Sequence, residues 1–410
     1  MPRCPFRFLH AADLHLERPP FGVADVPDHL RRLFIEACYW AAERVFDAAI
    51  SEGAGLVVLS GDVLDPNGTG PRGPRFLLEQ FERLAARSIA VYWAGGRVDP
   101  PEVWPAALSL PKNVRVFPRG RPQDFLHRRD DEPIARLVGA SRTRRQRIRA
   151  ADFDGDENEL FTIAVAHGRA TADSLRLRAV DYWALGGRHS AHTLLGGPRV
   201  ARYCGTPQGR RPSESGPHGC TLVDVDGHGH PRITMIPTDV LRWQTERIRL
   251  DDTATRAELE SQLHQRARGL KESLSGIDVM VVWEVAAGEP LAAELRRGRL
   301  AAELLETLRK QYGFGPPAVW SVSLSVEAPQ ELPPDWYEQD TILGDFLREI
   351  RRYQGDPAEP LGLETLLSEE QMAGFWGDAA AVADPGRREQ TLREAAMLGV
   401  DLLSGEVSQS

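Results

Sequence analysis

The chain has 410 residues, a length that predicts two or three domains rather than one compact core. Its 42% hydrophobic and 27% charged residues are typical of globular proteins, and no apolar run approaches the roughly 20 residues of a membrane helix. The net charge of −9 argues against a protein that attracts polyanions through its overall charge. The N-terminus shows no signal-peptide pattern and the four cysteines lack CxxC spacing, so we expect a cytoplasmic protein with reduced thiols.

The first part of the chain alternates strands and helices. An apolar run over 6–9 predicts a strand, helical spacing over 27–52 predicts a helix, and the run 56–59 predicts a buried second strand. A helix near 75–87 and a strand over 89–93 continue this order. The rhythm is typical of α/β architecture, in which functional residues lie at the strand ends.

The following part, to about residue 240, has more strands and fewer long helices. Strands are expected at 134–139, 160–166, 180–185, 200–204, 219–225 and 232–236. Because fewer long helices separate them, we expect this half to be more antiparallel than the first.

The pattern changes after Pro237. Strands are expected at 243–250, 277–285 and 319–326, with helical segments near 253–274 and 290–311 between them. This order predicts a separate, small βαβαβ unit. From Pro329 onward, punctuation by proline and glycine indicates short amphipathic helices near 337–353, 361–375 and 387–402.

Acidic and histidine side chains gather after these predicted strands. Asp13 and His15 follow the first, Asp62 follows the second, and His167 and His189 follow the strands that end near 166 and 185. Alternate residues of an extended chain point the same way, so Asp13 and His15 could reach one metal. A lone histidine after a strand is more often a packed or surface residue. The order of all five, however, predicts a site for divalent metals, and mixed Asp and His ligands suit manganese, iron or zinc better than calcium.

Several short stretches together resemble the calcineurin-like metallophosphoesterase superfamily, and within it the SbcD/YhaO-type subunits of DNA-repair exonucleases. The matching stretches are 8–15, 59–65, 91–95, 166–168, 181–186, 203–210 and 214–220. The resemblance implies a four-layer sandwich of two mixed β-sheets flanked by helices over 1–240. It further implies a small α/β cap over 241–328 and a helical tail over 329–410, which in the family docks a partner; these last two parts match only in layout.

The resemblance also implies roles for the clustered residues. Asp13, His15 and His189 correspond to ligands of a first metal, and Asp62 corresponds to the carboxylate that bridges to a second. His167 corresponds to a ligand of the second metal. All five are present.

The second metal site departs from the family pattern. Gly96 stands where the family has asparagine, Arg97 replaces the catalytic histidine, and Gly187 replaces the first histidine of the GHxH segment. We therefore expect one divalent ion, Mn²⁺ or another transition metal, rather than two. On this mapping, restoring all three family residues should raise the metal occupancy to two.

Two arginines stand beside these gaps. We hypothesise that Arg97 and Arg188 supply part of the positive charge of the missing ion, because arginine binds phosphate through a fork of hydrogen bonds. The alternative is that both point into solvent or pair with Asp65 and Asp99. Loss of the catalytic histidine alone would lower the rate by about 10²–10⁴-fold, so we expect weak or absent hydrolysis.

A further run of arginines occupies 142–149. It could neutralise nucleic-acid phosphates, but a solvated loop is the favoured interpretation, because the chain uses arginine nearly everywhere it needs a cation.

Two functions follow from these observations. The first is a metal-dependent phosphodiesterase or exonuclease that acts on or binds DNA with reduced activity. The alternative is a non-catalytic, one-metal DNA-binding or scaffold subunit of an SMC-like, coiled-coil ATPase complex. The segment Ile342–Leu347 is a candidate for docking that ATPase, although a helix that packs back on its own chain is slightly favoured. Homodimerisation is left open.

Overall fold

The computed structural model describes residues 3–65, 70–143, 147–153, 160–274, 276–326, 332, 334–357, 359–366, 368, 382 and 384–404. Two compact units make up the chain. The first contains 1–245, 273–280 and 315–318, and the second contains 246–272, 281–314 and 319–410. None of the described helices has the length and apolar character needed to cross a membrane.

The first unit contains a six-stranded mixed sheet in the order β12-β11-β1-β2-β3-β4. Its strands are β1 (Phe6–Ala11), β2 (Leu56–Ser60), β3 (Ala90–Ala94), β4 (Val114–Phe117), β11 (Gly219–Val225) and β12 (Pro231–Pro237). Strands β1 to β4 are parallel to one another, and β11 and β12 complete the sheet in antiparallel pairings. The short β4 was not expected from the sequence.

A second six-stranded sheet has the order β5-β6-β7-β8-β10-β9. Its strands are β5 (Gln123–Arg129), β6 (Glu132–Ala140), β7 (Phe161–His167), β8 (Tyr182–Gly186), β9 (His192–Leu195) and β10 (Val200–Tyr203). The expectation that this half is more antiparallel than the first is confirmed by the pairings of β5 with β6, β9 with β10, and β11 with β1 and β12, although β6, β7, β8 and β10 are parallel. A parallel crossover needs a long connection but not a long helix, and the segment 141–160 between β6 and β7 is long enough.

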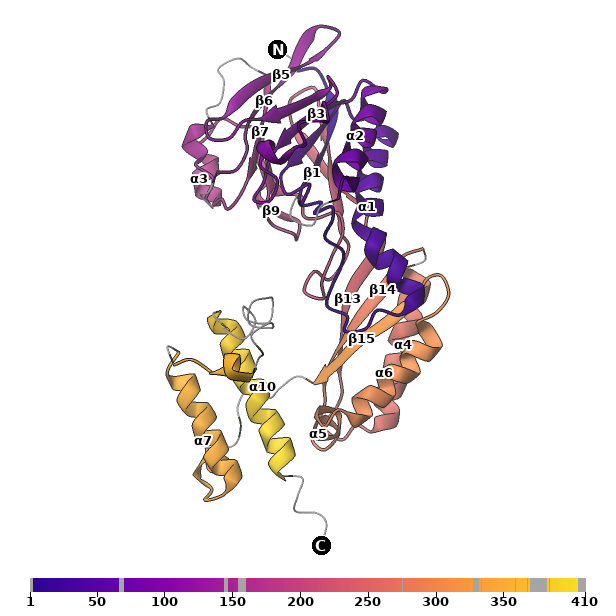
Figure 1. Cartoon of the computed structure of the whole chain (residues 1–410), viewed down its shortest axis with the longest axis vertical. Coiled ribbons are helices and arrows are strands. Elements are labelled where there is room, and N and C mark those ends of the chain that lie inside the picture. The colour runs from indigo at the N-terminus through magenta and orange to yellow at the C-terminus, as the bar shows by residue number, and fades with distance from the viewer. Residues whose placement is uncertain are drawn as a thin grey trace. The chain divides into compact units, whose positions relative to one another are not determined.

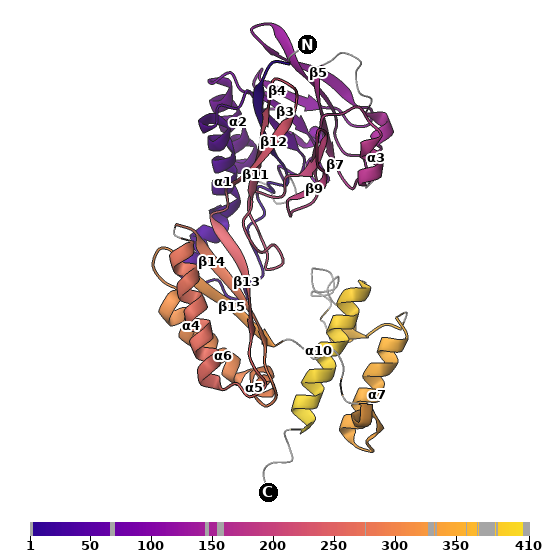
Figure 2. The same cartoon turned by 180° about the vertical axis from the view of Figure 1, so that it is seen from behind.

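The two sheets pack face to face between helices, which gives the four layers expected from the sequence. Alternation along the strands shows this directly: Phe8 and Val58 lie in the core between the sheets, whereas Leu9 and Val57 face the core beneath the helices α1 and α2. Helices α1 (Asp28–Ser51) and α2 (Arg72–Ala85) cover one side, and the short α3 (Ala172–Arg176) lies on the other, as Figures 1 and 2 show. Two 3₁₀ turns, η2 (Pro101–Val103) and η3 (Ala150–Asp152), lie in the loops.

A three-stranded sheet lies mostly in the second unit and has the order β13-β14-β15. Its elements follow the predicted strand–helix sequence: β13 (Leu241–Arg249), α4 (Arg256–Ser273), β14 (Asp278–Ala286), α5 (Leu291–Arg296), α6 (Arg299–Tyr312) and β15 (Val319–Val326). The one helix expected over 290–311 is two helices. They are separated at Gly298, whose φ of 86° is left-handed and interrupts the helical backbone.

The C-terminal part contains η4 (Pro334–Glu338), α7 (Ile342–Gly355), η5 (Leu363–Leu366) and α10 (Pro385–Ser404). Leu347 and Ile350 of α7 pack against Leu392 and Val400 of α10. The candidate docking helix therefore buries one face within the tail, as the favoured interpretation expected. Of the helix predicted over 361–375, the structure shows a 3₁₀ turn, and residues 369–375 lie outside the described part.

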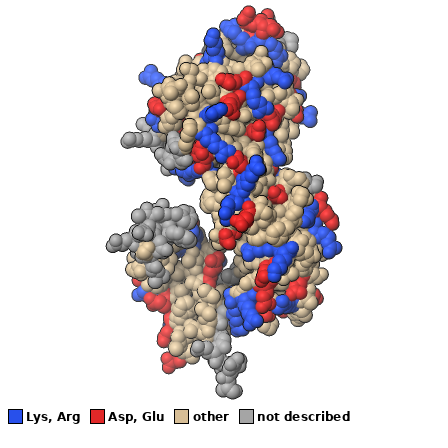
Figure 3. Space-filling model, turned by 45° about the vertical axis from the view of Figure 1, so that its right-hand side comes forward, with Lys and Arg blue, Asp and Glu red and all other residues tan. Residues whose placement is uncertain are grey.

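Charged side chains of both signs are interspersed over the face shown in Figure 3. Neither sign dominates that face in either unit.

The carboxyl ends of β2 and β8, one strand from each sheet, come into contact at a glycine. Gly186, the last residue of β8, lies against the Ser60 carbonyl at the end of β2, and an added Cβ would overlap that oxygen and lie 3.0 Å from Ala12 Cβ. We expect Gly186→Ala to destabilise the protein by about 1–3 kcal/mol, because the sheets would have to separate. Thermal unfolding should show the lowered midpoint.

The matched control is Gly196→Ala, since a Cβ there meets nothing within 4 Å and the backbone is not left-handed. Equal midpoints for the two variants would show that the contact at Gly186 does not limit how closely the sheets pack.

Candidate metal centre

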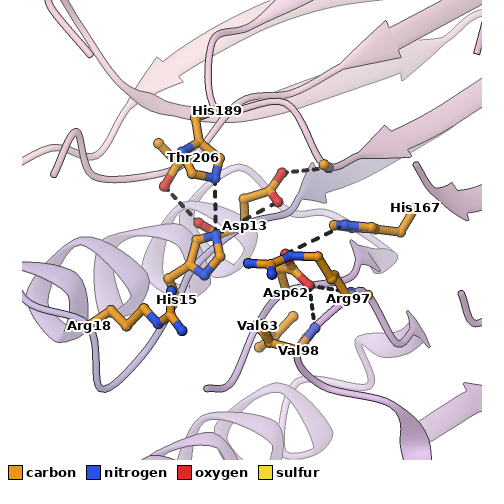
Figure 4. Close-up of polar contacts among 12 residues, drawn as sticks. Asp13, His15, Arg18, Asp62, Val63, Arg97, Val98, His167, His189 and Thr206 are labelled. Carbon is orange, nitrogen blue, oxygen red and sulfur yellow. Dashed lines mark hydrogen bonds and ion pairs between the residues drawn. The ribbon is translucent and has the colours of Figure 1, made fainter. Parts of the chain in front are cut away.

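The structure brings all five predicted ligand residues to one edge of the sandwich. Asp13 and His15 follow β1, Asp62 follows β2, His167 ends β7, and His189 lies three residues after β8. Because these strands are parallel within each sheet, their carboxyl ends lie together. Ligand atoms of Asp13, His15 and His189 lie within 4.8 Å of one another, as do those of Asp13, Asp62 and His167 (Figure 4).

The loops that carry the first three ligands are not extended. Asp13, His15 and Asp62 have φ values of 54°, 46° and 51°, which are left-handed and uncommon for residues other than glycine. The expectation that Asp13 and His15 alternate along a strand is therefore wrong, since β1 ends at Ala11. Such conformations cost of order 1–3 kcal/mol each and occur preferentially at functional sites.

Backbone hydrogen bonds hold these two loops side by side. Asp13 N–H donates to Gly61 O (2.9 Å), and His15 N–H donates to Asp62 O (3.0 Å). The pairing continues from Leu16 N–H to Val63 O (3.1 Å). The positions of Asp13, His15 and Asp62 are thus set by the backbone rather than by side-chain packing.

The first group of ligands has the electrostatics of a cation site. Asp13 is fully buried, and its Oδ1 has no hydrogen-bond partner among the described residues. Burial raises the pKa of Asp13 well above its usual value, and the nearby Asp62 carboxylate raises it further. His15 Nε2 lies 3.1 Å from His189 Nε2, and burial lowers the pKa of His15, so its imidazole is neutral. Buried carboxylates facing neutral imidazole nitrogens fit a divalent transition metal.

The second group of candidate ligands consists of Asp13, Asp62 and His167, and its polar contacts differ from those of the first. His167 Nδ1 lies 2.9 Å from Ser60 O, a geometry in which Nδ1–H donates and Nε2 faces the cluster. Nε2 lies 3.6 Å from Asp62 Oδ2. The other oxygen, Asp62 Oδ1, accepts backbone N–H bonds from Arg97 and from Val98 (2.9 Å). Two amides therefore bind Oδ1, whereas Oδ2 faces His167.

The loop that supplies these amides is anchored by Asp99. This buried carboxylate accepts N–H bonds from Gly96 (2.6 Å), Asp62 (2.8 Å) and Val63 (2.9 Å). Burial raises the pKa of Asp99 to about 7, and the Asp62 carboxylate adds to the shift, whereas the three amides oppose it. Asp99 thus holds the loop against Asp62.

Glycines at two positions exclude the side chains of the missing ligands. A Cβ added to Gly96 would overlap Asp62 N and Oδ1. Gly187 has a φ of +98°, and a Cβ there would lie 3.0 Å from His167 Nε2. A side chain at Gly96 would therefore require the backbone to move, whereas one at Gly187 would be strained by the left-handed φ and tight against the His167 ring.

The cluster lies at the base of a cavity of about 560 Å³ that is rich in arginine. The lining arginines are Arg18, Arg97, Arg142, Arg169, Arg210 and Arg211. In Figure 4 the Arg97 side chain extends toward the space between His15 and Asp62.

Arg188 is not among the lining residues and is exposed. The suggested pairings with Asp65 and Asp99 are also not found: Asp65 pairs with Arg18, and the Asp99 oxygens accept the three backbone bonds.

Sequence analysis missed most of these arginines. Arg18 and Arg169 follow His15 and His167 by three and two residues, so their proximity to the ligands was a usable signal. The positions of Arg210 and Arg142 depend on loops far away in sequence from the ligands they approach.

The sequence also did not predict the carboxylate that contacts the His189 ring. His189 Nδ1 lies 2.7 Å from Glu214 Oε1, and Glu214 Oε2 accepts the Arg210 N–H (2.8 Å). Burial alone would raise the pKa of Glu214, but the bonds from His189 and Arg210 outweigh it and hold the pKa at about 2. Glu214 is therefore ionised and fixes the orientation of the His189 ring, with Nε2 directed to the cluster.

Comparison with known proteins gave one informative likeness. No family model matches the chain. The chain is 28% identical over 359 residues to the uncharacterized metallophosphoesterase YhaO of Bacillus subtilis, covering 84% of this chain and 87% of that protein. This likeness supports a place in the metallophosphoesterase superfamily.

Solved structures gave weaker likenesses. The protein TT1561 of Thermus thermophilus has a TM-score of 0.35 at 10% identity, over 57% of this chain and all of that one. A dimetal phosphatase from Danio rerio has a TM-score of 0.33 at 12% identity, over 57% of this chain and 99% of that one. These TM-scores are too low to support a fold assignment, which therefore rests on the strand order of the two sheets.

Gly96→Asn should lower the amount of bound metal rather than restore a second ion, because the new side chain would displace Asp62. Metal analysis of the protein after dialysis against Mn²⁺ measures the number of ions per chain. Gly196→Asn is the matched control, since nothing lies within 4 Å of a Cβ there. A gain of one ion per chain in Gly96→Asn would show that the loop can open and would contradict this structure of the centre.

Glu214→Ala should weaken Mn²⁺ binding by about 10–100-fold, because His189 would lose the carboxylate that orients it. Isothermal titration with Mn²⁺ measures the change. Glu214→Gln should lose less, since the amide oxygen can still accept from Nδ1, and Glu102→Ala, an exposed partner of Arg119, should have no effect. Unchanged affinity in Glu214→Ala would remove His189 from the ligand set.

Proposed function

We propose that this metallophosphoesterase-like chain binds phosphodiesters of DNA through a single divalent cation and a set of arginines, and hydrolyses them slowly at most. The observation that carries the proposal is the cavity itself: buried Asp and His ligands lie at its base, and six arginines line it. Such a combination is suited to a phosphate group, which a cation and guanidinium groups bind together.

The ion would be held by the first group of ligands. Asp13, His15 and His189 offer atoms close to one another, and Asp62 lies in the adjoining group with Asp13 and His167. A bound cation supplies positive charge to the phosphate and lowers the pKa of a coordinated water. Mn²⁺ is the proposed ion, on the mixed oxygen and nitrogen character of the donors.

Arginines would bind the phosphate oxygens. Among the described residues, no carboxylate forms an ion pair with the guanidinium of Arg97, Arg142 or Arg169, although all three line the cavity. Their donors are therefore available to a ligand. A guanidinium fork matches two oxygens of a phosphate and is not deprotonated at neutral pH.

Two features support slow hydrolysis. The histidines that line the described cavity are His15, His167 and His189, and all three belong to the ligand groups. Arg97 stands at the position where the resembled family has a separate imidazole, and it cannot donate a proton to a leaving group at neutral pH. The absence of that proton donor typically costs about 10²–10⁴-fold in rate.

A role as a subunit of an SMC-like ATPase complex is the second candidate. On the tail, Ile342, Leu398 and Leu402 are 76%, 48% and 61% exposed, although α7 and α10 bury their other faces against each other. Exposed apolar side chains on this two-helix tail favour the interpretation that it binds a protein partner.

Arg97→Ala should weaken the binding of a thymidine dinucleotide in Mn²⁺ by about ten- to 100-fold, the effect of removing a charge-assisted hydrogen bond worth roughly 1.5–3 kcal/mol. Fluorescence anisotropy of the labelled dinucleotide measures the change. Arg188→Ala is the matched control: it is exposed outside the cavity and should bind as the wild type does. Equal losses in both variants would mean that Arg97 acts only through the general charge of the protein.

The same preparations test hydrolysis with a nitrophenyl phosphodiester. Fast turnover that Asp62→Asn abolishes would overturn the proposal of slow hydrolysis and would favour a full two-metal mechanism.

A further inference from the structure

A second arginine-lined pocket adjoins the cavity of the metal centre. It has a volume of about 740 Å³, and its lining arginines are Arg121, Arg142, Arg147 and Arg149. Among its lining residues the acidic one is Asp152, which lies 3.9 Å from the Arg149 guanidinium. Arg142 and His167 line both this pocket and the cavity. The two hollows therefore lie on either side of the same pair of side chains.

The arginine segment that forms this pocket is attached to the metal centre. Arg142 N–H donates to Gly95 O (2.8 Å), at the start of the loop that holds Asp62. Ile148 N–H donates to Arg169 O (2.9 Å), and Arg147 and Arg169 form an isolated parallel β-bridge. The arginine run 142–149, which was expected to be a solvated loop, is thus hydrogen-bonded to the backbone near both of its ends. One bond is to the loop that contacts Asp62, and the other is to Arg169, two residues after His167.

These attachments place the charges in a defined order. Arg169 lines the cavity, Arg147 lines the second pocket, and their backbones are paired. Arg142 stands between the two hollows. Its side chain lines the cavity together with Asp62 and also borders the second pocket. The backbone that carries the charges is already fixed, so an anion that binds there orders only side chains.

The floor of the second pocket is apolar. Ala140 and Ala166 come from neighbouring strands β6 and β7, Ile148 comes from the arginine segment, and Phe153 follows the turn η3. A pocket with charged walls and an apolar floor is suited to a ligand that combines phosphate with less polar groups, as a nucleotide unit does. Inorganic phosphate alone would leave that floor uncovered.

We infer that the second pocket binds the next phosphates of a phosphodiester strand whose first phosphate lies at the metal centre. The inference rests on the proposed function, because it takes the cavity as the site of that first phosphate. The ligand class is a strand with several consecutive phosphodiesters, and Arg142 lies between the two binding positions.

The experiment compares strands of different length. Labelled oligothymidylates with one phosphodiester or with seven are titrated with the full chain in Mn²⁺ at several salt concentrations. The wild type should bind the octamer at least tenfold more tightly than the dinucleotide. The double variant Arg147→Ala/Arg149→Ala should lose that gain, and the slope of log K against log salt should fall by about 1.4, at roughly 0.7 for each phosphate that is no longer neutralised.

Two further variants make the result specific. Arg147→Lys/Arg149→Lys keeps the charge and should keep most of the gain in affinity. Arg128→Ala/Arg129→Ala removes the same charge from β5, outside both hollows, and should bind as the wild type does. Equal losses in the β5 variant would overturn the inference, since only the overall charge would then matter.

The outcomes separate the two proposals. If the dinucleotide does not bind the wild type, the phosphate site at the metal centre fails, and this inference fails with it. If the dinucleotide binds but the octamer binds no better, the second pocket alone is wrong and the proposed function stands.

Discussion

The close approach of one loop to Asp62 determines the character of the candidate centre. The amides of Arg97 and Val98 bind one oxygen of this carboxylate, and Asp99 holds the loop in place through three further amides. Only a glycine fits at position 96 in this arrangement. The same backbone thus fixes Asp62 Oδ1 and leaves Oδ2 facing His167.

Charge balance explains the arginines. A buried cluster that contains Asp13 and Asp62 is unfavourable without cations, because desolvated carboxylates repel one another. Backbone amides offset part of this cost at Asp62, and arginines around the rim supply positive charge at longer range. Arginine keeps its charge under partial burial, as lysine does less readily, which suits the half-buried Arg142. The result is a cavity in which buried carboxylates lie beneath a rim of arginines.

Local sequence patterns predicted the candidate metal ligands but did not predict which arginines lie around them. Asp13, His15 and Asp62 follow apolar runs that could only be buried strands, so their convergence followed from α/β architecture. Arg188 was chosen because it is next to a gap in a motif, yet the turn after Gly187 leaves it exposed. Arg142 belonged to a run that composition assigned to solvent, and a single bond to Gly95 places it at the cavity.

The sequence by itself determined the α/β character of the first unit and the five clustered candidate ligands, because strand periodicity and residue identity are local properties; the two-sheet sandwich followed from the family resemblance. It could not determine the parallel pairing of the second sheet, the role of Glu214 behind His189, or the arginines that face the cavity. Those depend on contacts between segments far apart along the chain. Only the tertiary structure shows why position 96 needs a glycine. A Cβ there would overlap Asp62, which lies 34 residues earlier in the chain.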